Sequence, residues 1–309
     1  MQINLDKNGW AVTVTDLDLN FATDDDINVL GCLCGYYSLV VLREQNLSIE
    51  RQEEICSKLG NTIKDLYPEE VAEIAKWAAT DDHPILAKGS NFITRVTDVP
   101  NKNGSPGMQG FYNGLPWHLD KPAIVDRPEI TWLYSVQDSA DTTTQFINNI
   151  ITYNDLDDET KETVKKLKIH YSDLGTAMRK IQKLFQQSGY TGPFIRTMVE
   201  EQDCNLVHTN PAGQTGIYWH PSTTYQFIGM SETESAEFGK KLWQHISKEQ
   251  YIYTHHWQDG DVVLNDQWFG LHQRLPYTKP NKRILHRIEA RYDHCDFTKL
   301  QDILKLVNT

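Results

Sequence analysis

The chain has 309 residues, with 30 Lys or Arg against 42 Asp or Glu, which gives a formal net charge of −12 at pH 7. This acidic balance disfavours nucleic acid and anionic membranes as partners, because both are themselves negatively charged. No apolar run approaches the roughly 20 residues that span a bilayer, and no basic stretch followed by an apolar segment opens the chain, so we expect a soluble, cytoplasmic protein.

Five cysteines are spread along the chain without a C-x-x-C pair, which argues against a disulfide framework and against a zinc ribbon. We expect them to serve as small buried hydrophobic residues. The length and the lack of a recognisable linker favour one domain over residues 1–309. Composition leaves open whether the chain forms a homo-oligomer.

In chain order, helix signals occur at 24–36, 48–59, 68–79, 157–167, 174–187 and 231–246, and Ser231 and Glu234 form a capping box at the start of the last. Strand-like runs occur at 38–42, 92–96, 130–137, 206–208, 217–219, 251–256, 261–264 and 283–292. These strands are short and separated by turn residues. The pattern favours a mainly β fold with flanking helices, a sandwich or jelly roll, over alternating βα units.

The most informative motif is His118-x-Asp120, which is followed by the strand-like run at 130–137. On an extended segment, residues two apart point to the same face, so both side chains can reach one metal ion. About one His-x-Asp triplet is expected by chance in this chain, and a second one exists, His294-x-Asp296. We interpret the second as a decoy, because it lies just before a predicted terminal helix.

A second group of polar residues begins about 150 residues later, with His272 and the strand at 283–292. In that strand Arg283, Leu285 and Arg287 share one face by the period of two, so both arginines can line the same cavity. The alternative is a solvent-exposed face with ordinary salt bridges, which is the more common role of such charges.

Two His and one Asp on one side of a metal leave its other positions open, which suits a non-haem Fe(II) oxygenase. An arginine just beyond the second His suits a dicarboxylate, because the planar guanidinium grips a carboxylate through two hydrogen bonds. His118, Asp120 and His272 are therefore candidate metal ligands. A hydrolytic zinc enzyme could use the same three residues, but it gives no reason for the paired arginines.

With these motifs the chain resembles the taurine dioxygenase family of Fe(II)/2-oxoglutarate-dependent oxygenases. The likeness rests on residues 40–60, on the Trp117-His118-x-Asp120 motif and on the block from 205 to 287, and it covers most of the chain. The likeness is poor at 67–113 and 172–200. The second of these segments is implied to be a lid over the active site, and a surface helix without that role is the alternative. The resemblance also implies a double-stranded β-helix core of the jelly-roll, cupin-like kind.

For the site, the resemblance implies that His118, Asp120 and His272 bind Fe(II) and that O₂ takes an open position on the metal. In the family an arginine eleven residues after the distal His binds the far carboxylate of 2-oxoglutarate, and here that residue is Arg283. A threonine helps to hold the same carboxylate, and Thr142 occupies the matching place. The final arginine, Arg287, is implied to lie near the substrate or near the metal-binding end of the co-substrate.

The resemblance implies hydroxylation of a small molecule, coupled to conversion of 2-oxoglutarate into succinate and CO₂. His220 and Thr223 match a stretch that contributes to the family's substrate pocket, where Thr223 replaces an aromatic residue, and Trp117 is expected to form part of the wall. With Arg287 as a spare cation, we expect a polar or zwitterionic substrate such as an amino acid or organic acid. A desaturase with the same chemistry and a non-catalytic jelly-roll binding protein are the alternatives.

Overall fold

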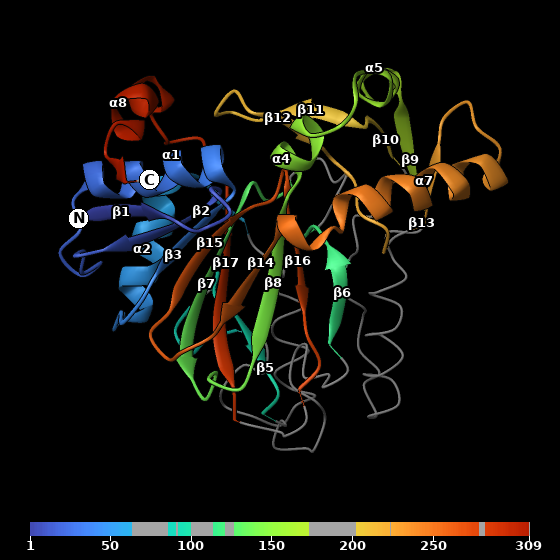
Figure 1. Cartoon of the computed structure of the whole chain (residues 1–309). Helices are drawn as coiled ribbons and strands as arrows, with labels where there is room; N and C mark the ends of the chain where they lie inside the picture. Colours follow the sequence, from blue (N-terminus) through green and yellow to red (C-terminus); the bar gives the residue numbers. More distant parts are fainter. Residues whose placement is uncertain are drawn as a thin grey trace.

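The computed structural model describes residues 1–63, 86–90, 92–99, 114–120, 127–172, 202–222, 224–277 and 282–308. Two β-sheets form the centre, and helices lie on the outer sides of both (Figure 1). This arrangement confirms the predicted mainly β fold with flanking helices. The helices predicted at 68–79 and 174–187, and all of the predicted lid except Ser172, lie outside the described residues.

The larger sheet contains β1 (Gln2–Leu5), β2 (Ala11–Thr15), β3 (Leu39–Leu42), β4 (Thr62–Ile63), β5 (Thr94–Thr97), β7 (Ile130–Gln137), β15 (Val262–Asp266), β17 (Ile284–Ala290) and β18 (Val307–Asn308). Its order is β18-β1-β2-β3-β15-β7-β17-β4, and β5 also pairs with β17. The central strand β15 is buried on both faces. Val262 and Leu264 join the core beneath the helices, whereas Val263 faces the core on the opposite side, which explains the unbroken apolar run in this strand.

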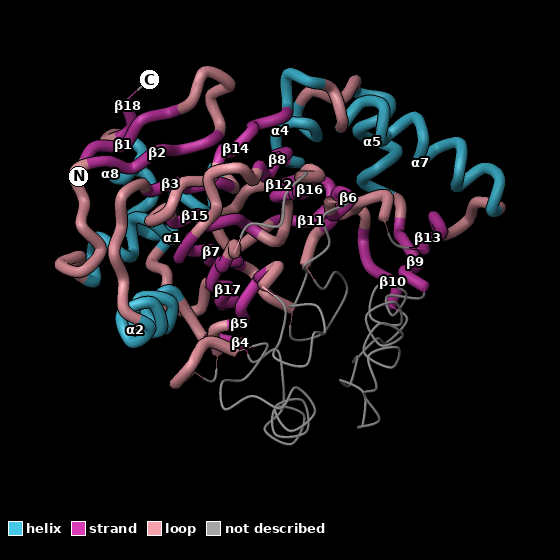
Figure 2. Tube along the Cα trace, turned by 90° about the horizontal axis from the view of Figure 1, so that it is seen from below, coloured by secondary structure: helices cyan, strands magenta, loops and turns pink. Residues whose placement is uncertain are grey.

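The smaller sheet contains β6 (Leu115–His118), β8 (Thr143–Asn148), β14 (Ile252–His256) and β16 (Gly270–Arg274), in the order β14-β8-β16-β6. Two minor sheets join β9 (Lys168–Ser172), β10 (Gln202–Asn205) and β13 (Thr224–Phe227), and β11 (Val207–Thr209) with β12 (Thr215–Ile217). Seen from below, the strands of the larger and smaller sheets lie beside one another (Figure 2). A buried cluster that includes Val96, Phe146 and Leu285 joins the two sheets.

The helices are α1 (Asp24–Tyr37), α2 (Ile49–Leu59), α4 (Asn149–Asn154), α5 (Asp158–Lys166), α7 (Glu232–Ile246) and α8 (Leu300–Leu304), with 3₁₀ turns at Glu249–Tyr251 and Phe297–Lys299. Ser48 caps α2 by accepting a hydrogen bond from the backbone N–H of Arg51. The predicted capping box of α7 is present, since Ser231 and Glu234 each accept from the other's backbone N–H. Local capping chemistry therefore fixes where these helices begin.

Helices α1 and α2 pack against the larger sheet, and α7 lies on the side of the smaller sheet (Figure 1). Glycine is required at position 60, just after α2, because a Cβ there would lie 2.1 Å from the backbone oxygen of Arg291. All five cysteines are free, and Cys32, Cys34 and Cys56 are fully buried. Among the described residues, no helix is long and apolar enough to cross a membrane.

Candidate active site

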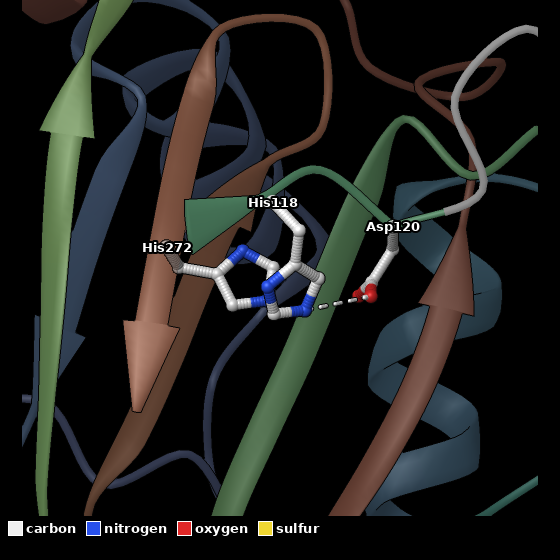
Figure 3. Close-up of side chains that lie close together, drawn as sticks. All are labelled: His118, Asp120 and His272. Atoms are coloured by element: carbon white, nitrogen blue, oxygen red, sulfur yellow. Dashed lines mark ion pairs between the residues drawn. The ribbon is translucent and has the colours of Figure 1, made fainter. Parts of the chain in front are cut away.

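The first two candidate ligands lie at the end of an edge strand. His118 is the last residue of β6, and Asp120 follows two residues later. Leu119, between them, is buried in the hydrophobic cluster on the other side of the sheet. This alternation directs His118 and Asp120 to the same side, as Figure 3 shows, and it is the arrangement that their i, i+2 spacing predicts.

The third candidate, His272, comes from the neighbouring strand β16 and pairs directly with His118 in the antiparallel register. The two imidazole rings have centroids 4.1 Å apart, and His118 Nε2 lies 3.7 Å from Asp120 Oδ1. One ligand atom from each of the three residues lies within 4.8 Å of the others. The side chains converge on a single point (Figure 3), so the group could hold a metal ion.

Hydrogen bonds from neighbouring residues fix the orientation of these side chains. His118 Nδ1 lies 2.7 Å from the carbonyl oxygen of Pro116, which leaves Nε2 free to bind a metal. Thr131 donates to Asp120 Oδ2 at 3.2 Å, and the Asp120 backbone N–H donates to Gln267 Oε1 at 2.8 Å. The site is therefore held in place by residues that sequence reasoning had not singled out.

Electrostatics favour the metal-binding form of His272. Burial, and after it the charge on His118, lower the pKa of His272 to about 3. The imidazole is therefore neutral at physiological pH, and a neutral imidazole is the form that binds a metal. Two imidazoles and one carboxylate on one side of a central point are a donor set that fits Fe(II).

The second His-x-Asp triplet has a different environment. His294 is exposed, and its Nδ1 lies 2.9 Å from the carbonyl oxygen of Ser57. Asp296 caps the 3₁₀ turn that follows, by accepting from the backbone N–H of Thr298 at 3.1 Å. The three-residue group of His118, Asp120 and His272 is the one metal-capable cluster found among the described residues, so the interpretation of His294-x-Asp296 as a decoy agrees with the structure.

The three candidate ligands face a cavity between the two sheets. Its lining residues come from both sheets and from the segments that join them: Val96, Leu115, His118, Asp120, Thr131, Leu133, Thr144, His272, Arg274, Arg283, Leu285 and Arg287. The predicted face of strand β17 is confirmed, because Arg283, Leu285 and Arg287 all line this cavity. The alternative of a solvated face is wrong, since Arg283 is only 2% exposed and Arg287 only 8%.

Arg283 is a buried cation with no ion pair among the described residues. Its backbone N–H donates to Asp98 Oδ1 at 2.9 Å, but its guanidinium lies within ion-pair distance of no carboxylate in this part of the chain, and its Nε has no hydrogen-bond partner. Burial lowers the pKa of Arg283 to about 10, so the group is still charged at neutral pH. A buried charge of this kind is costly unless an anion binds it.

The threonine implied by the resemblance needs a correction. Thr142 lies in the turn before β8, where its hydroxyl donates to the Ser139 carbonyl at 2.8 Å, and it does not line the cavity. The cavity is lined instead by Thr144, which lies two residues later and within the strand. Thr144 Oγ1 accepts a hydrogen bond from Trp257 Nε1 at 2.9 Å, so its own O–H is available to donate to a ligand.

Arg287 lies at the metal end of the cavity. Its Nη1 is 3.6 Å from Asp120 Oδ1, and its Nη2 is 3.5 Å from Glu289 Oε1. Two carboxylates therefore already share the charge of Arg287. Arg287 is therefore not the spare cation that was expected, because a paired guanidinium offers less to a further anion. An acidic substrate would have to be bound by another group.

The residues expected to face the substrate differ in where they lie. Trp117 belongs to the hydrophobic cluster outside the smaller sheet, with its ring 6.1 Å from that of Trp243, and it does not line the cavity. His220 does not line the cavity either; it is buried, its Nδ1 accepts from the Ser222 backbone N–H at 3.4 Å, and its Nε2 has no hydrogen-bond partner among the described residues. Burial, followed by the nearby His118 and His272, lowers the pKa of His220 to about 3. Thr223 lies outside the described residues.

Comparison with known proteins identifies related sequences. The chain is 22% identical over 212 residues to pentalenolactone F synthase of Streptomyces avermitilis, a match that covers 66% of this chain and 69% of that protein. It is 32% identical over 78 residues to tyrosine isonitrile desaturase of Erwinia amylovora, which covers 25% of this chain and 26% of that protein. These are similarities over part of each sequence.

Solved structures share the fold. A taurine dioxygenase from Burkholderia xenovorans superposes with a TM-score of 0.68 at 18% identity, and covers 94% of this chain and 88% of its own. The structure of AAD-2 in complex with Mn(II) and N-oxalylglycine gives a TM-score of 0.68 at 19% identity, with 94% and 97% covered. Residues 10–288 match the model of the "Taurine catabolism dioxygenase TauD, TfdA family". The chain therefore belongs to this family of jelly-roll dioxygenases, which use Fe(II), 2-oxoglutarate and O₂.

Proposed function

We propose that His118, Asp120 and His272 are the Fe(II) ligands of this enzyme and that the adjoining cavity binds 2-oxoglutarate. The observation that carries the proposal is the convergence of this triad on a cavity that also contains the buried guanidinium of Arg283. A metal at one end and a cation at the other match the two ends of a 2-oxo dicarboxylate. Bound Fe(II) would supply O₂ activation, coupled to release of succinate and CO₂.

The chain's own residues would orient the co-substrate. Arg283 would grip the far carboxylate through its planar fork, and Thr144 would donate to the same carboxylate because its oxygen already accepts from Trp257. At the other end, Thr131 and Arg287 would hold the Asp120 carboxylate in one orientation. The hydrophobic side chains of Val96, Leu133 and Leu285 line the space between and would exclude water from the reacting groups.

The reaction that we propose is hydroxylation of a C–H bond in a small polar or zwitterionic metabolite, such as an amino acid or organic acid. His220 is the candidate substrate-binding side chain among the described residues, because a buried, neutral imidazole with an unpartnered Nε2 can offer a hydrogen bond to a ligand. Thr223 is a second candidate, by its place three residues later in the sequence. Trp117 would support the wall through its packing on Trp243.

Desaturation is the second candidate outcome of the same chemistry. It is favoured by the 32% identity over 78 residues to tyrosine isonitrile desaturase. Product analysis distinguishes the two reactions, since hydroxylation adds one oxygen atom to the substrate and desaturation removes two hydrogen atoms.

The metal site is tested with single alanine variants. We expect His118→Ala, Asp120→Ala and His272→Ala each to lose Fe(II) binding and 2-oxoglutarate decarboxylation, because three-ligand sites tolerate the loss of a ligand poorly. His294→Ala is the matched control from the other His-x-Asp triplet and should retain both. Iron bound by the His118→Ala protein and lost from the His294→Ala protein would refute the assignment. If the parent protein binds iron but forms no succinate with any compound in a broad panel of substrates, a non-catalytic binding protein would be favoured.

A further inference from the structure

We propose that Arg274 is a second carboxylate-binding residue of the cavity, so that two guanidinium groups hold the far carboxylate of the 2-oxo acid. This inference rests on the proposed function and extends it to the selectivity of the co-substrate site. Arg274 lies on β16, two residues after His272, and both line the cavity. It is only 5% exposed.

The strand register brings Arg274 to Thr144. In the antiparallel pairing of β16 with β8, Arg274 pairs with Thr144, whereas His272 pairs with Phe146. Each step of two residues along a strand moves a side chain by about 6–7 Å on the same face. Arg274 and Thr144 therefore lie together, one step away from the metal end of the cavity.

Arg283 lies at the same end of the cavity as Arg274. Burial, and next the charge on Arg274, lower the pKa of Arg283 to about 10, so the two guanidinium groups are close enough to repel each other. Asp98 acts on both of them, accepts from the Arg283 backbone N–H at 2.9 Å and lies 3.4 Å from the Tyr277 hydroxyl. A ligand carboxylate between the guanidinium groups would relieve their repulsion.

The consequence is strict selection for a dicarboxylate. An acid that lacks the far carboxylate would forgo charge-assisted contacts with both Arg274 and Arg283, which costs more affinity than the loss of a contact with one guanidinium group. The matched probe pair is 2-oxoglutarate and 2-oxopentanoate, which have the same chain length and differ by a carboxylate against a methyl group. The parent enzyme should discriminate strongly between them.

The test measures binding of both acids to the Fe(II) protein under anaerobic conditions, by the visible absorption of the metal complex. We expect Arg274→Met to lower the affinity for 2-oxoglutarate by about tenfold or more and to leave the affinity for 2-oxopentanoate nearly unchanged. The ratio of the two affinities should therefore fall. Arg274→Lys keeps the positive charge but loses the planar guanidinium, and it should lower the affinity for 2-oxoglutarate by a smaller factor. Arg291→Met is the matched control, because Arg291 pairs with Asp293 outside the cavity, and it should bind as the parent does.

Two results would overturn the inference: Arg274→Met binding 2-oxoglutarate as the parent does, or both acids weakened by the same factor, which would indicate a structural role. If Arg274→Met does not fold, Arg274→Lys decides, and unchanged discrimination in that variant also overturns the inference. Failure of the proposed function is distinguishable, since the parent protein itself would then show no absorption change with Fe(II) and 2-oxoglutarate.

Discussion

Replacement of Arg283 by glutamine separates the binding role of this residue from its effect on stability. The glutamine is shorter and uncharged, so it removes both the cation and the planar fork from the end of the cavity. The guanidinium is 2% exposed and has no ion pair among the described residues. Its charge is therefore unfavourable in the ligand-free protein and favourable once a carboxylate binds.

The two effects have opposite signs. Burial lowers the pKa of Arg283 from 12.5 to about 10. Because one pKa unit corresponds to about 1.4 kcal/mol, the buried charge costs about 3 kcal/mol of folding stability. The group is protonated below pH 10 in both the folded and the unfolded chain, so the whole cost is present at pH 7. Against this, a charge-assisted bidentate contact with a carboxylate stabilises the complex by roughly 3 kcal/mol, which corresponds to roughly a hundredfold in affinity.

We therefore expect Arg283→Gln to bind 2-oxoglutarate tens to a hundred times more weakly, and to unfold at the same temperature as the parent or a few degrees higher when no ligand is present. Anaerobic titration of the Fe(II) protein measures the first quantity, and thermal unfolding of the metal-free protein measures the second. Unchanged 2-oxoglutarate binding would refute the assignment of Arg283. A large loss of ligand-free stability would refute the view that its charge is unsatisfied there.

The remaining predictions concern four other positions. Thr144→Val should lower the affinity for 2-oxoglutarate several-fold, through loss of roughly one neutral hydrogen bond. Thr142→Val should leave this affinity unchanged and lower only the stability, by about 1 kcal/mol, because its hydrogen bond to Ser139 is lost. The reverse result would restore the original assignment of Thr142. Burial lowers the pKa of His286 from 6.5 to about 4. The stability that neutral His286 contributes is therefore complete above pH 6.5 and is lost as the pH falls toward 4, by up to about 3 kcal/mol. In urea unfolding, the free energy of unfolding of His286→Gln should fall less steeply than that of the parent between pH 6.5 and pH 4, and an equal fall would contradict this role of His286. His220→Leu should leave 2-oxoglutarate binding unchanged and reduce succinate formation stimulated by substrate; equal stimulation in parent and variant would exclude His220 from the substrate pocket.

Much of the scaffold could be predicted because its signals are local. The predicted strand at 130–137 coincides with β7, and the predicted starts of α2 and α7 hold because Ser48 and Ser231 cap them. The predicted helix at 24–36 is one residue shorter than α1. Each of these elements is specified by its own residues, through a cap or an apolar run, so no knowledge of distant contacts is needed.

The strands that carry the site were harder to predict. Strands β8 (TTQFIN) and β16 (GLHQR) were missed, because polar residues that face the cavity interrupt the apolar alternation of a typical strand. Since β8 was missed, its register was unknown, and the threonine was assigned to Thr142 rather than to Thr144. Arg274 was missed for the same reason: its role depends on pairing between β16 and β8, which are more than 120 residues apart in the sequence.

The candidate metal ligands were predictable although these strands were missed. The two-residue spacing of His118 and Asp120 fixes their common face on any extended segment. The family likeness then implied roles for His272 and Arg283, although only the fold shows that Arg287 is paired with Asp120 and Glu289. Ion pairing between strands is a tertiary property, so the sequence could not distinguish a spare arginine from a paired one.

We propose that one cavity holds Fe(II) at the triad and 2-oxoglutarate between that metal and Arg283. The most direct test is anaerobic titration of the purified protein with Fe(II) and 2-oxoglutarate, alone and together, followed by visible absorption. We predict a charge-transfer band that appears only when both are present, that saturates at one equivalent of each, and that is absent from Asp120→Ala. A parent protein that binds Fe(II) at the triad but gives no such band at saturating 2-oxoglutarate would contradict this proposal.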